Sequence, residues 1–325
     1  MRKTLLAIIA TLCLSLQAKA ENIVFANSNV KALCIANWDT NNDGELSTEE
    51  AAAVTTLGNV FRGNTTIGSF DELRYFTSLT AIDDYAFYKS NIKGELYIPG
   101  NVKTIGEYAF NSCQRLTRVV LEEGVETIGR YCFSGPIGDL VLPSTLKNIG
   151  SYTIDPYVNA DPSMGIFVPD GDLYVYVHSQ EPATINDFAF YYIIAEGHLV
   201  VPIGTIDAYK AVSGWSYFGE YLEFGDIDMD GDIDNDDLGL IKDYINGEAG
   251  DDFNKDIADT NGDGVVDEVD VQNISDIVDE STDISNIDDN INQRNDDKMY
   301  NLSGQVVGES YKGIVIKNGK KYIKR

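Results

Sequence analysis

The sequence has few histidines, few cysteines and few basic residues for a chain of 325 residues. Its only histidines, His178 and His198, each lie in or beside an expected β-strand, and neither has a serine or cysteine nucleophile in a supporting context. We therefore predict that the protein is not an enzyme. Carboxylates are abundant, so a pair suited to glycoside hydrolysis is the catalytic alternative.

The shortage of basic residues limits the partners of the chain. Lys and Arg number 24 against 52 Asp and Glu, so the formal net charge is −28. Residues 1–20 hold three bases and no acid, and without them the net charge is −31. Because such a chain repels nucleic acid and anionic membranes, we expect neither as a partner. The same charge favours Ca²⁺ as a ligand.

Long apolar runs are also absent after the first 20 residues. Arg2 and Lys3 precede the apolar stretch Leu5 to Leu16, and Ala18-Lys19-Ala20 has the small residues of a cleavage site. These features predict a signal peptide over residues 1–20. No later run approaches the ~18 residues of a membrane span. We expect an exported protein without a membrane span, either secreted or held at the outer cell surface.

Three cysteines remain after the predicted leader, namely Cys34, Cys113 and Cys132. An odd number leaves at least one cysteine without a disulfide partner. We interpret all three as small buried hydrophobic residues. A bridge between Cys113 and Cys132 is the alternative, although these residues fall at different positions of adjacent repeats.

A six-residue phrase recurs through the middle of the chain. It begins with Ile, has Tyr or Phe at its fourth position, and in most copies ends in Phe. The first three copies start 23 residues apart, which predicts a solenoid whose repeats stack on one another. The copies are Ile82 to Phe87, Ile105 to Phe110, Ile128 to Phe133, Ile149 to Ile154 and Ile185 to Phe190. We expect Gly106, Gly129 and Gly150 to occupy turns with positive φ.

Short apolar runs between the phrases predict one strand per repeat. Alternate residues of a strand face opposite sides of a sheet, so half of each run would point into the core. The expected inward residues are Leu96, Ile98, Val119, Leu121, Leu140, Leu142, Leu173, Val175, Leu199 and Val201. The expected outward residues, which form a candidate partner-binding row, are Tyr97, Val120, Val141, Tyr174 and Val200. This row is either a contact strip or cross-strand packing that stabilises the sheet.

The segment from about Phe70 to Phe224 resembles the BspA-like leucine-rich repeat family of bacterial surface proteins. The resemblance rests on Val102 to Cys113, with Leu116 after it, and on the closing stretch Val201 to Trp215. It implies adhesion, since family members typically bind host proteins or other cells. The segment around Asp155 to Asp170 departs from the repeat pattern.

An acidic loop between two expected helices lies ahead of the repeats, within residues 30–61. Its spacing of oxygen-bearing residues matches the twelve-residue calcium loop of an EF-hand, with a glycine at position 6. The alternative is a solvated acidic turn that caps the next helix. The predicted ligands are Asp39, Asn41, Asp43, Glu45, Ser47 and Glu50, with Glu45 acting through its carbonyl. We expect this element to cover the N-terminal end of the solenoid.

Two more loops of this kind follow the repeats, and each leads into an expected helix (238–246 and 271–278). Residues 226–297 contain 25 acidic residues and three basic ones. The predicted Ca²⁺ ligands are Asp226, Asp228, Asp230, Asp232, Asp237, Asp259, Asn261, Asp263, Val265 and Asp270, with Val265 acting through its carbonyl. Loop then helix, twice, resembles a type I dockerin.

The dockerin resemblance implies a cohesin partner on a bacterial scaffold. Dockerins present a matched pair of residues at loop positions 10 and 11. Here these are Asn235-Asp236 and Glu268-Val269, which do not match each other. The alternative is a spacer that calcium rigidifies and that has no cohesin partner.

The last 45 residues contain a polar acidic segment followed by a basic one. Residues 281–297 are polar and read as a flexible acidic linker. Residues 298–325 are basic and predict two or three short strands with glycine turns. This tail is similar to C-terminal tails of exported proteins from Gram-negative gut and oral bacteria, which implies a sorting signal. A simple hairpin, or a basic patch that docks on the acidic region, is the alternative.

The expected fold class is α+β, a leucine-rich repeat solenoid with helical calcium-binding modules on both sides. The expected domains are a signal peptide (1–20), an EF-hand-like helical cap (21–69), the solenoid (70–224), an all-α dockerin-like domain (225–280), the linker (281–297) and the tail (298–325). We predict an exported, non-enzymatic binding or adhesion protein. The alternative is a component docked to a cohesin-type scaffold and linked to polysaccharide degradation.

Overall fold

The computed structural model describes residues 20–133, 137–154, 173–190, 197–250, 253–279, 298–301, 306–308, 313–317 and 320–324. Residues 1–19 of the expected leader, the irregular segment 155–170 and the expected linker 281–297 lie outside these ranges. The chain divides into two compact units. The first comprises Met1–Leu199 and Asp207–Glu220, and the second comprises Val200–Ile206 and Tyr221–Arg325. Among the described residues, no helix has the length and apolar character needed to cross a membrane.

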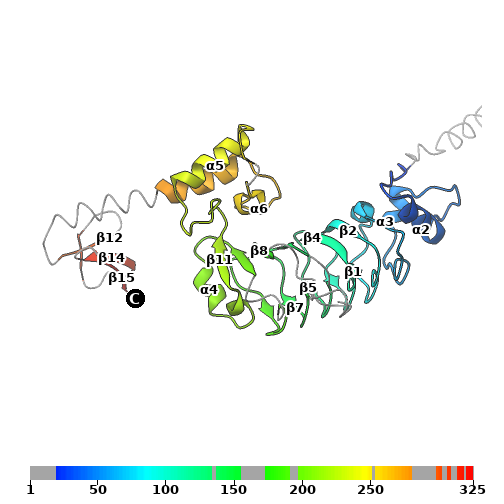
Figure 1. The fold of residues 1–325 in the computed structure, drawn as a ribbon, viewed down its shortest axis with the longest axis horizontal. Helices are drawn as coiled ribbons and strands as arrows, with labels where there is room; N and C mark the ends of the chain where they lie inside the picture. The colour runs from blue at the N-terminus through cyan, green and yellow to red at the C-terminus, as the bar shows by residue number, and fades with distance from the viewer. Residues whose placement is uncertain are drawn as a thin grey trace, which may run out of the picture. The chain divides into compact units, whose positions relative to one another are not determined.

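The first unit begins with helix α2 (Ser28–Trp38) and the short helix α3 (Thr48–Ala52) on either side of an acidic loop (Figure 1). Helix α2 starts where the side chain of Asn27 accepts hydrogen bonds from the N–H groups of Asn29 and Val30. Helix α3 starts with a capping box formed by Ser47 and Glu50. This confirms the expected order of helix, loop and helix, although α3 is shorter than the sequence suggested.

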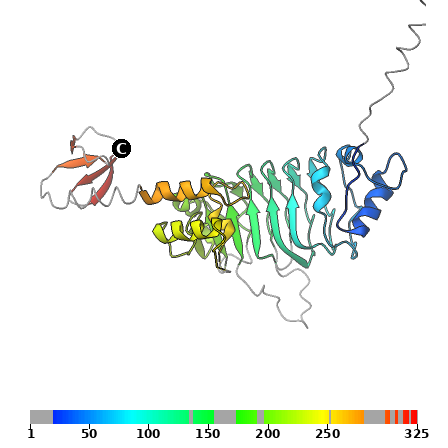
Figure 2. The same ribbon diagram turned by 90° about the horizontal axis from the view of Figure 1, so that it is seen from above.

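A parallel sheet runs through the repeats, with one strand from each of the five repeats and a sixth strand, β11, from the closing segment. Its order is β2-β4-β6-β8-β10-β11, so consecutive long strands of the solenoid are neighbours, as the arrows from cyan to green show in Figure 2. The strands are β2 (Lys93–Ile98), β4 (Arg115–Leu121), β6 (Asp139–Leu142), β8 (Tyr174–Val177), β10 (His198–Val201) and β11 (Glu220–Glu223). The strand predicted for each repeat is therefore confirmed.

A second parallel sheet is built from the first residue of each recurring phrase and the residue before it. Each strand has two residues, and the isoleucines pair in register from one repeat to the next, as in Ile82 with Ile105 and Ile105 with Ile128. The order is β1-β3-β5-β7-β9. The strands are β1 (Ala81–Ile82), β3 (Thr104–Ile105), β5 (Thr127–Ile128), β7 (Asn148–Ile149) and β9 (Thr184–Ile185).

The core of the repeats lies between these two sheets and is built from equivalent residues of each repeat. Every predicted inward residue of the long strands is buried, and so are the Ile, the small residue and the last residue of each phrase. The Phe rings of the phrase stack along the solenoid, with centroids 4.8 Å apart between Phe87 and Phe110 and 5.6 Å apart between Phe110 and Phe133. Because no single repeat can enclose these rings, stacking supplies the buried area.

The glycines of the phrase have a different role from the predicted one. Positive φ belongs to the tyrosines two residues later, at 57° for Tyr108 and 50° for Tyr131. The glycines instead permit close approach of the preceding repeat. A Cβ on Gly129 would lie 2.6 Å from the backbone nitrogen of Glu107, and one on Gly150 would lie 2.5 Å from that of Arg130. The prediction of positive φ at these glycines is therefore wrong, because contact between repeats sets the constraint.

Two short helices, α4 (Ile206–Lys210) and the 3₁₀ helix η2 (Trp215–Tyr217), lie between β10 and β11. The indole of Trp215 is buried and donates a hydrogen bond to the carbonyl oxygen of Ala183 at 2.9 Å. The hydroxyl of Tyr209 donates to the carbonyl oxygen of Ser179 at 2.8 Å. These bonds fasten the closing segment to the last repeat.

The second unit contains acidic loops with helices and a small sheet. Helix α5 (Asn235–Ile245) and a helix over residues 268–279 each follow an acidic loop, as predicted. A short helix α6 (Lys255–Ala258) precedes the second of these loops. The tail forms an antiparallel sheet in the order β13-β12-β14-β15. Its strands are β12 (Met299–Asn301), β13 (Val306–Val307), β14 (Gly313–Lys317) and β15 (Lys320–Lys324).

Candidate functional site

The outward face of the long sheet carries the predicted contact row only in part. Tyr97 aligns with Val120, and Val120 with Val141. Tyr97 is 46% exposed and the two valines are half-buried. The next residue in register is Tyr176, which is buried at 2% exposure. The exposed part of this row therefore lies on β2, β4 and β6.

Two members of the predicted row are misplaced. Tyr174 aligns with Asp139, so it belongs to a neighbouring row and not to the row of Tyr97. Val200 is fully buried and offers no surface to a partner. The sequence could not fix this register, because the insertion before β8 interrupts the repeat period.

The neighbouring row carries charge as well as aromatic rings. Arg118 pairs with Asp139 across β4 and β6, with 3.4 Å between Nη1 and Oδ2. The ring of Tyr174 stacks on that of His198, with centroids 4.4 Å apart. At the β2 end, the hydroxyl of Tyr97 donates to Glu95 at 2.7 Å, and this hydrogen bond is the main reason that the pKa of Tyr97 is raised. The sheet face is thus a mixed polar and aromatic surface.

A ladder of aromatic rings, which was not predicted from the sequence, also runs along the solenoid. It contains the fourth residue of each phrase. Neighbouring rings are parallel within 16° and their centroids are 4.9 to 5.9 Å apart. The ladder comprises Tyr85, Tyr108, Tyr131, Tyr152 and Phe188. The guanidinium of Arg62 lies over the ring of Tyr85, 4.9 Å from its centroid, at the start of the ladder. The Tyr or Phe that recurs at the fourth position of each phrase was the signal that could have revealed it.

The three acidic loops span 39–50, 226–237 and 259–270, and we number their residues 1 to 12. In each loop the carboxylate at position 1 accepts the N–H of the glycine at position 6. That glycine has positive φ in every case, at 83°, 100° and 86°. The bonds are Gly44 to Asp39 at 3.0 Å, Gly231 to Asp226 at 3.2 Å and Gly264 to Asp259 at 2.8 Å. The turn predicted at position 6 is confirmed in all three loops.

The acid at position 12 closes each loop in the same way. One carboxylate oxygen accepts the N–H of position 3 and the other accepts the N–H of position 9. For Glu50 the donors are Asn41 and Ser47, at 3.2 and 3.0 Å. For Asp237 they are Asp228 and Asp234, at 3.2 and 2.9 Å. For Asp270 they are Asn261 and Asp267, at 3.3 and 3.0 Å. A shared register of hydrogen bonds therefore gives the three loops one shape.

Positions 3 and 5 complete this pattern. The side chain at position 3 accepts the N–H of position 5, and that at position 5 accepts the N–H of position 7. The acceptors are Asn41 and Asp43 in the first loop, Asp228 and Asp230 in the second, and Asn261 and Asp263 in the third. In each loop the side chains at positions 1, 3, 5 and 12 thus accept hydrogen bonds from the loop's own backbone.

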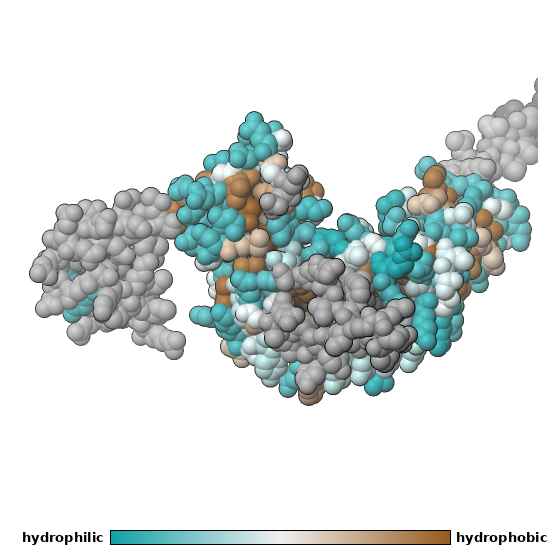
Figure 3. Space-filling view, in the orientation of Figure 1, coloured by the Kyte–Doolittle hydropathy of each residue, from teal (hydrophilic) through white to brown (hydrophobic). Residues whose placement is uncertain are grey.

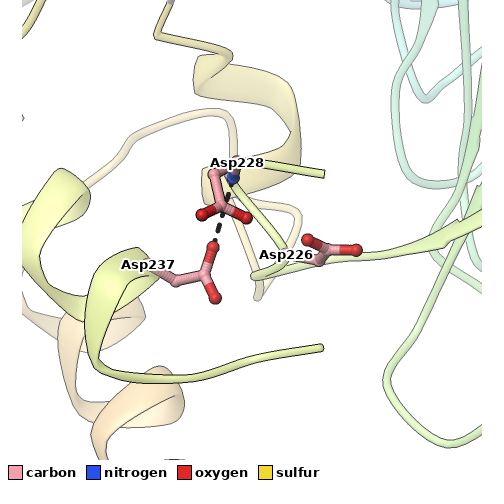
Figure 4. A group of neighbouring side chains, drawn as sticks. All are labelled: Asp226, Asp228 and Asp237. Atoms are coloured by element: carbon pink, nitrogen blue, oxygen red, sulfur yellow. Dashed lines mark hydrogen bonds between the residues drawn. The ribbon is translucent and has the colours of Figure 1, made fainter. Parts of the chain in front are cut away.

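The second loop gathers its carboxylates most tightly. Asp226, Asp228 and Asp237 each offer an oxygen within 4.8 Å of the others, and Figure 4 shows the Asp228 and Asp237 carboxylates facing one another. Burial raises the pKa of Asp226 to about 6, and the charge of Asp237 adds to that effect. A cation among these oxygens would neutralise the repulsion, and an all-oxygen donor set suits Ca²⁺. The residues present therefore fit the ion that the sequence predicted, and Ca²⁺ binding stays a prediction.

The remaining predicted ligands lie at positions 7 and 9. At position 7, the side chains of Val265 (58% exposed) and Asp232 point to solvent, and coordination through the carbonyl at this position stays a prediction. Glu45 in the first loop pairs with Lys31 at 2.6 Å, which directs its carboxylate away from a ligand role. Sequence reasoning passed over two residues at position 9: Asp234 accepts the N–H of Asp236 and starts α5, and Asp267 likewise accepts that of Val269.

The three described cysteines are buried and form no disulfide. The Cys113 thiol donates to the carbonyl oxygen of Phe87 at 3.3 Å, and burial raises its pKa to about 11. Burial raises the pKa values of Cys34 and Cys132 as well. Thiols in this state are poor nucleophiles, so the interpretation as small core residues is confirmed.

The fold defines a leucine-rich repeat solenoid with one strand per repeat in a parallel sheet. Residues 57–157 match the family model described as the BspA type leucine rich repeat region, in six copies. The match begins within the segment interpreted as the N-terminal cap, where Leu57 and Phe61 are buried and Phe61 stacks on Phe87 at 5.0 Å. No curated protein matches the chain.

Proposed function

We propose that this chain is an exported adhesion protein that binds other proteins through its leucine-rich repeat solenoid. The match of residues 57–157 to BspA-type repeats carries the proposal. A parallel sheet whose strands lie side by side offers an extended surface, which suits a large partner better than a small substrate. In the view of Figure 3 the described surface is mostly hydrophilic, with brown patches that are small and separate. Such a surface favours recognition through polar and aromatic groups together.

Calcium has a structural role in this proposal. The carboxylates of the three loops are pre-arranged by backbone hydrogen bonds, and Ca²⁺ would bind at positions 1, 3, 5, 7 and 12. Ions that bind the folded loops and not the unfolded chain stabilise the fold by mass action. The proposal therefore requires Ca²⁺ to organise the loops and the solenoid to recognise the partner.

The test is capture of proteins from host matrix extract by the chain without its predicted leader, in Ca²⁺ and in chelator. Val120→Arg and Val141→Arg place charge at half-buried positions of the outward face. They should abolish capture while leaving the circular dichroism spectrum unchanged. Thr117→Arg, at an exposed bulge position of β4 outside this row, is the matched control. Equal capture by the face variants and the control would refute recognition through this row.

A second candidate function follows from the loops of the second unit. Loops 226–237 and 259–270 have the same internal pattern of hydrogen bonds, and each leads into a helix. The repeated loop and helix supports a dockerin-like module that joins the chain to a bacterial scaffold. In that case bacterial lysate would supply a partner that chelator releases, and the variants on β4 and β6 would still capture it. A host partner retained by those variants would favour neither role.

A further inference from the structure

A groove of about 680 Å³ lies in the first unit, where the segment ahead of α2 meets η1 (Asp71–Tyr75) and β2. Its walls include Ala26 from the N-terminal segment and Lys93 and Tyr97 from β2. Four acids line it against two bases. The acids are Asp71, Glu72, Glu95 and Glu122, and the bases are Arg74 and Lys93.

Glu72 distinguishes this groove from an ordinary charged surface. Its side chain is only 2% exposed, and one carboxylate oxygen accepts the N–H of Ala26. The other oxygen, Oε2, is buried and has no hydrogen-bond partner. A buried carboxylate oxygen without a hydrogen-bond donor is unfavourable. The Glu72 carboxylate would therefore be stabilised by a nearby donor or positive charge.

The distribution of the acids argues for an organic cation and against a metal ion. Among the described residues, the one group of three or more acids whose oxygens meet within 4.8 Å is Asp226, Asp228 and Asp237 of the second loop. In the groove, Glu95 already accepts from the Tyr97 hydroxyl, and Glu122 accepts from the N–H of Gly100 at 3.2 Å. The exposed bases in the same wall would also repel a divalent ion.

We propose that this groove recognises a lysine or arginine side chain on an extended segment of a partner protein. The charged group would enter the groove beside Glu72, whose buried carboxylate acts as its counter-ion, and its stem would lie against the exposed ring of Tyr97. The exposed bases Arg74 and Lys93 would meet acceptors that flank the basic residue. The inference rests on the proposed binding role and gives the chemistry of one contact within it.

The test uses the ¹⁵N-labelled chain 21–325 in Ca²⁺ and three blocked tripeptides, Gly-Arg-Gly, Gly-Lys-Gly and Gly-Gln-Gly. We expect saturable shifts of the Ala26, Lys93 and Tyr97 amide signals with the two cationic peptides and none with the glutamine peptide. Glu72→Gln keeps the size of the side chain and removes its charge, so it should weaken binding of the cationic peptides by about tenfold or more. Glu181→Gln, at an exposed acid outside the groove, should leave binding unchanged.

Equal shifts with all three peptides, or unchanged binding in Glu72→Gln, would overturn the proposal. Shifts of the same amides that depend on protein concentration without peptide would assign the groove to a second copy of the chain and would also overturn it. Should Glu72→Gln not fold, Tyr97→Ala on the solvent face provides the second variant, with an expected loss of about threefold. The peptide titration does not depend on capture from matrix extract. A failure of the groove proposal can therefore be told apart from a failure of the proposed adhesion function.

Discussion

Close approach of the backbone in neighbouring repeats depends on single glycines. At Gly106, Gly129 and Gly150 an added Cβ would come within 2.5 or 2.6 Å of an atom of the preceding repeat. In the first phrase Asp83 occupies the equivalent position, and its carboxylate accepts the N–H groups of Leu57 and Gly58. The first repeat therefore has a hydrogen-bonding side chain at the position where the next three phrases have glycine.

Replacement of one of these glycines should destabilise the solenoid. Gly129→Ala forces apart two backbone segments, and overpacking of this kind costs about 1 to 3 kcal/mol or more in the free energy of unfolding. The measurement is equilibrium unfolding in urea. Gly138→Ala is the control, because the nearest heavy atom to its Cβ lies at 3.8 Å. Equal stability of the two variants would contradict the close-approach explanation.

At the scale of the element, the aromatic ladder explains an unusual backbone. Tyr85, Tyr108, Tyr131 and Tyr152 all have φ between 50° and 60°, a region that costs a bulky residue about 1 kcal/mol or more. Each of the middle tyrosines stacks between two parallel rings, and one such aromatic pair contributes about 0.5 to 1.5 kcal/mol beyond the area that it buries. The two stacks therefore offset the strain of the turn.

Removal of one ring from the middle of the ladder should be costly. Tyr131→Ala loses the stacks on Tyr108 and Tyr152, both with centroids 5.0 Å apart, and keeps the strained backbone. We expect a loss of about 2 to 4 kcal/mol in the free energy of unfolding. Tyr217→Ala is the control, since that ring is 46% exposed. Thermal unfolding of both variants tests the ladder, and similar melting temperatures would count against it.

The acidic loops are elements whose shape follows from local hydrogen bonds. Asp226→Asn keeps the size of the side chain at position 1 but removes its charge, so it should abolish one of the predicted calcium sites. Asp236→Asn removes the same charge at an exposed position 11. Isothermal titration should show one fewer Ca²⁺ bound in Asp226→Asn than in Asp236→Asn. Full binding in both variants would show that this loop is not a calcium site.

At the scale of the whole molecule, the division into two compact units predicts two unfolding transitions. Gly129→Ala should lower the melting temperature of one transition only, because its contacts lie within the first unit. Asp226→Asn in Ca²⁺ should lower only the other. Differential scanning calorimetry of the wild type and both variants tests this assignment. A single transition that both variants shift equally would show that the units unfold together.

The sequence by itself determined the repeat architecture and the acidic loops. A period of 23 residues and alternating apolar residues are enough to place one strand in each repeat, because each repeat meets its neighbours in the same way. The loops were equally readable, since the hydrogen bonds to the acids at positions 1 and 12 join residues within one stretch of twelve. Local spacing therefore encodes local geometry.

Only the tertiary structure decided which residues reach the surface and which contacts join distant segments. It placed Tyr176 and not Tyr174 beside Val141, and it buried Val200, because register after an insertion depends on pairing with the preceding strand. It also brought Glu72 to Ala26, which lies 46 residues earlier. These outcomes arise from packing between segments that are far apart in the chain, and no periodicity in the sequence encodes such packing.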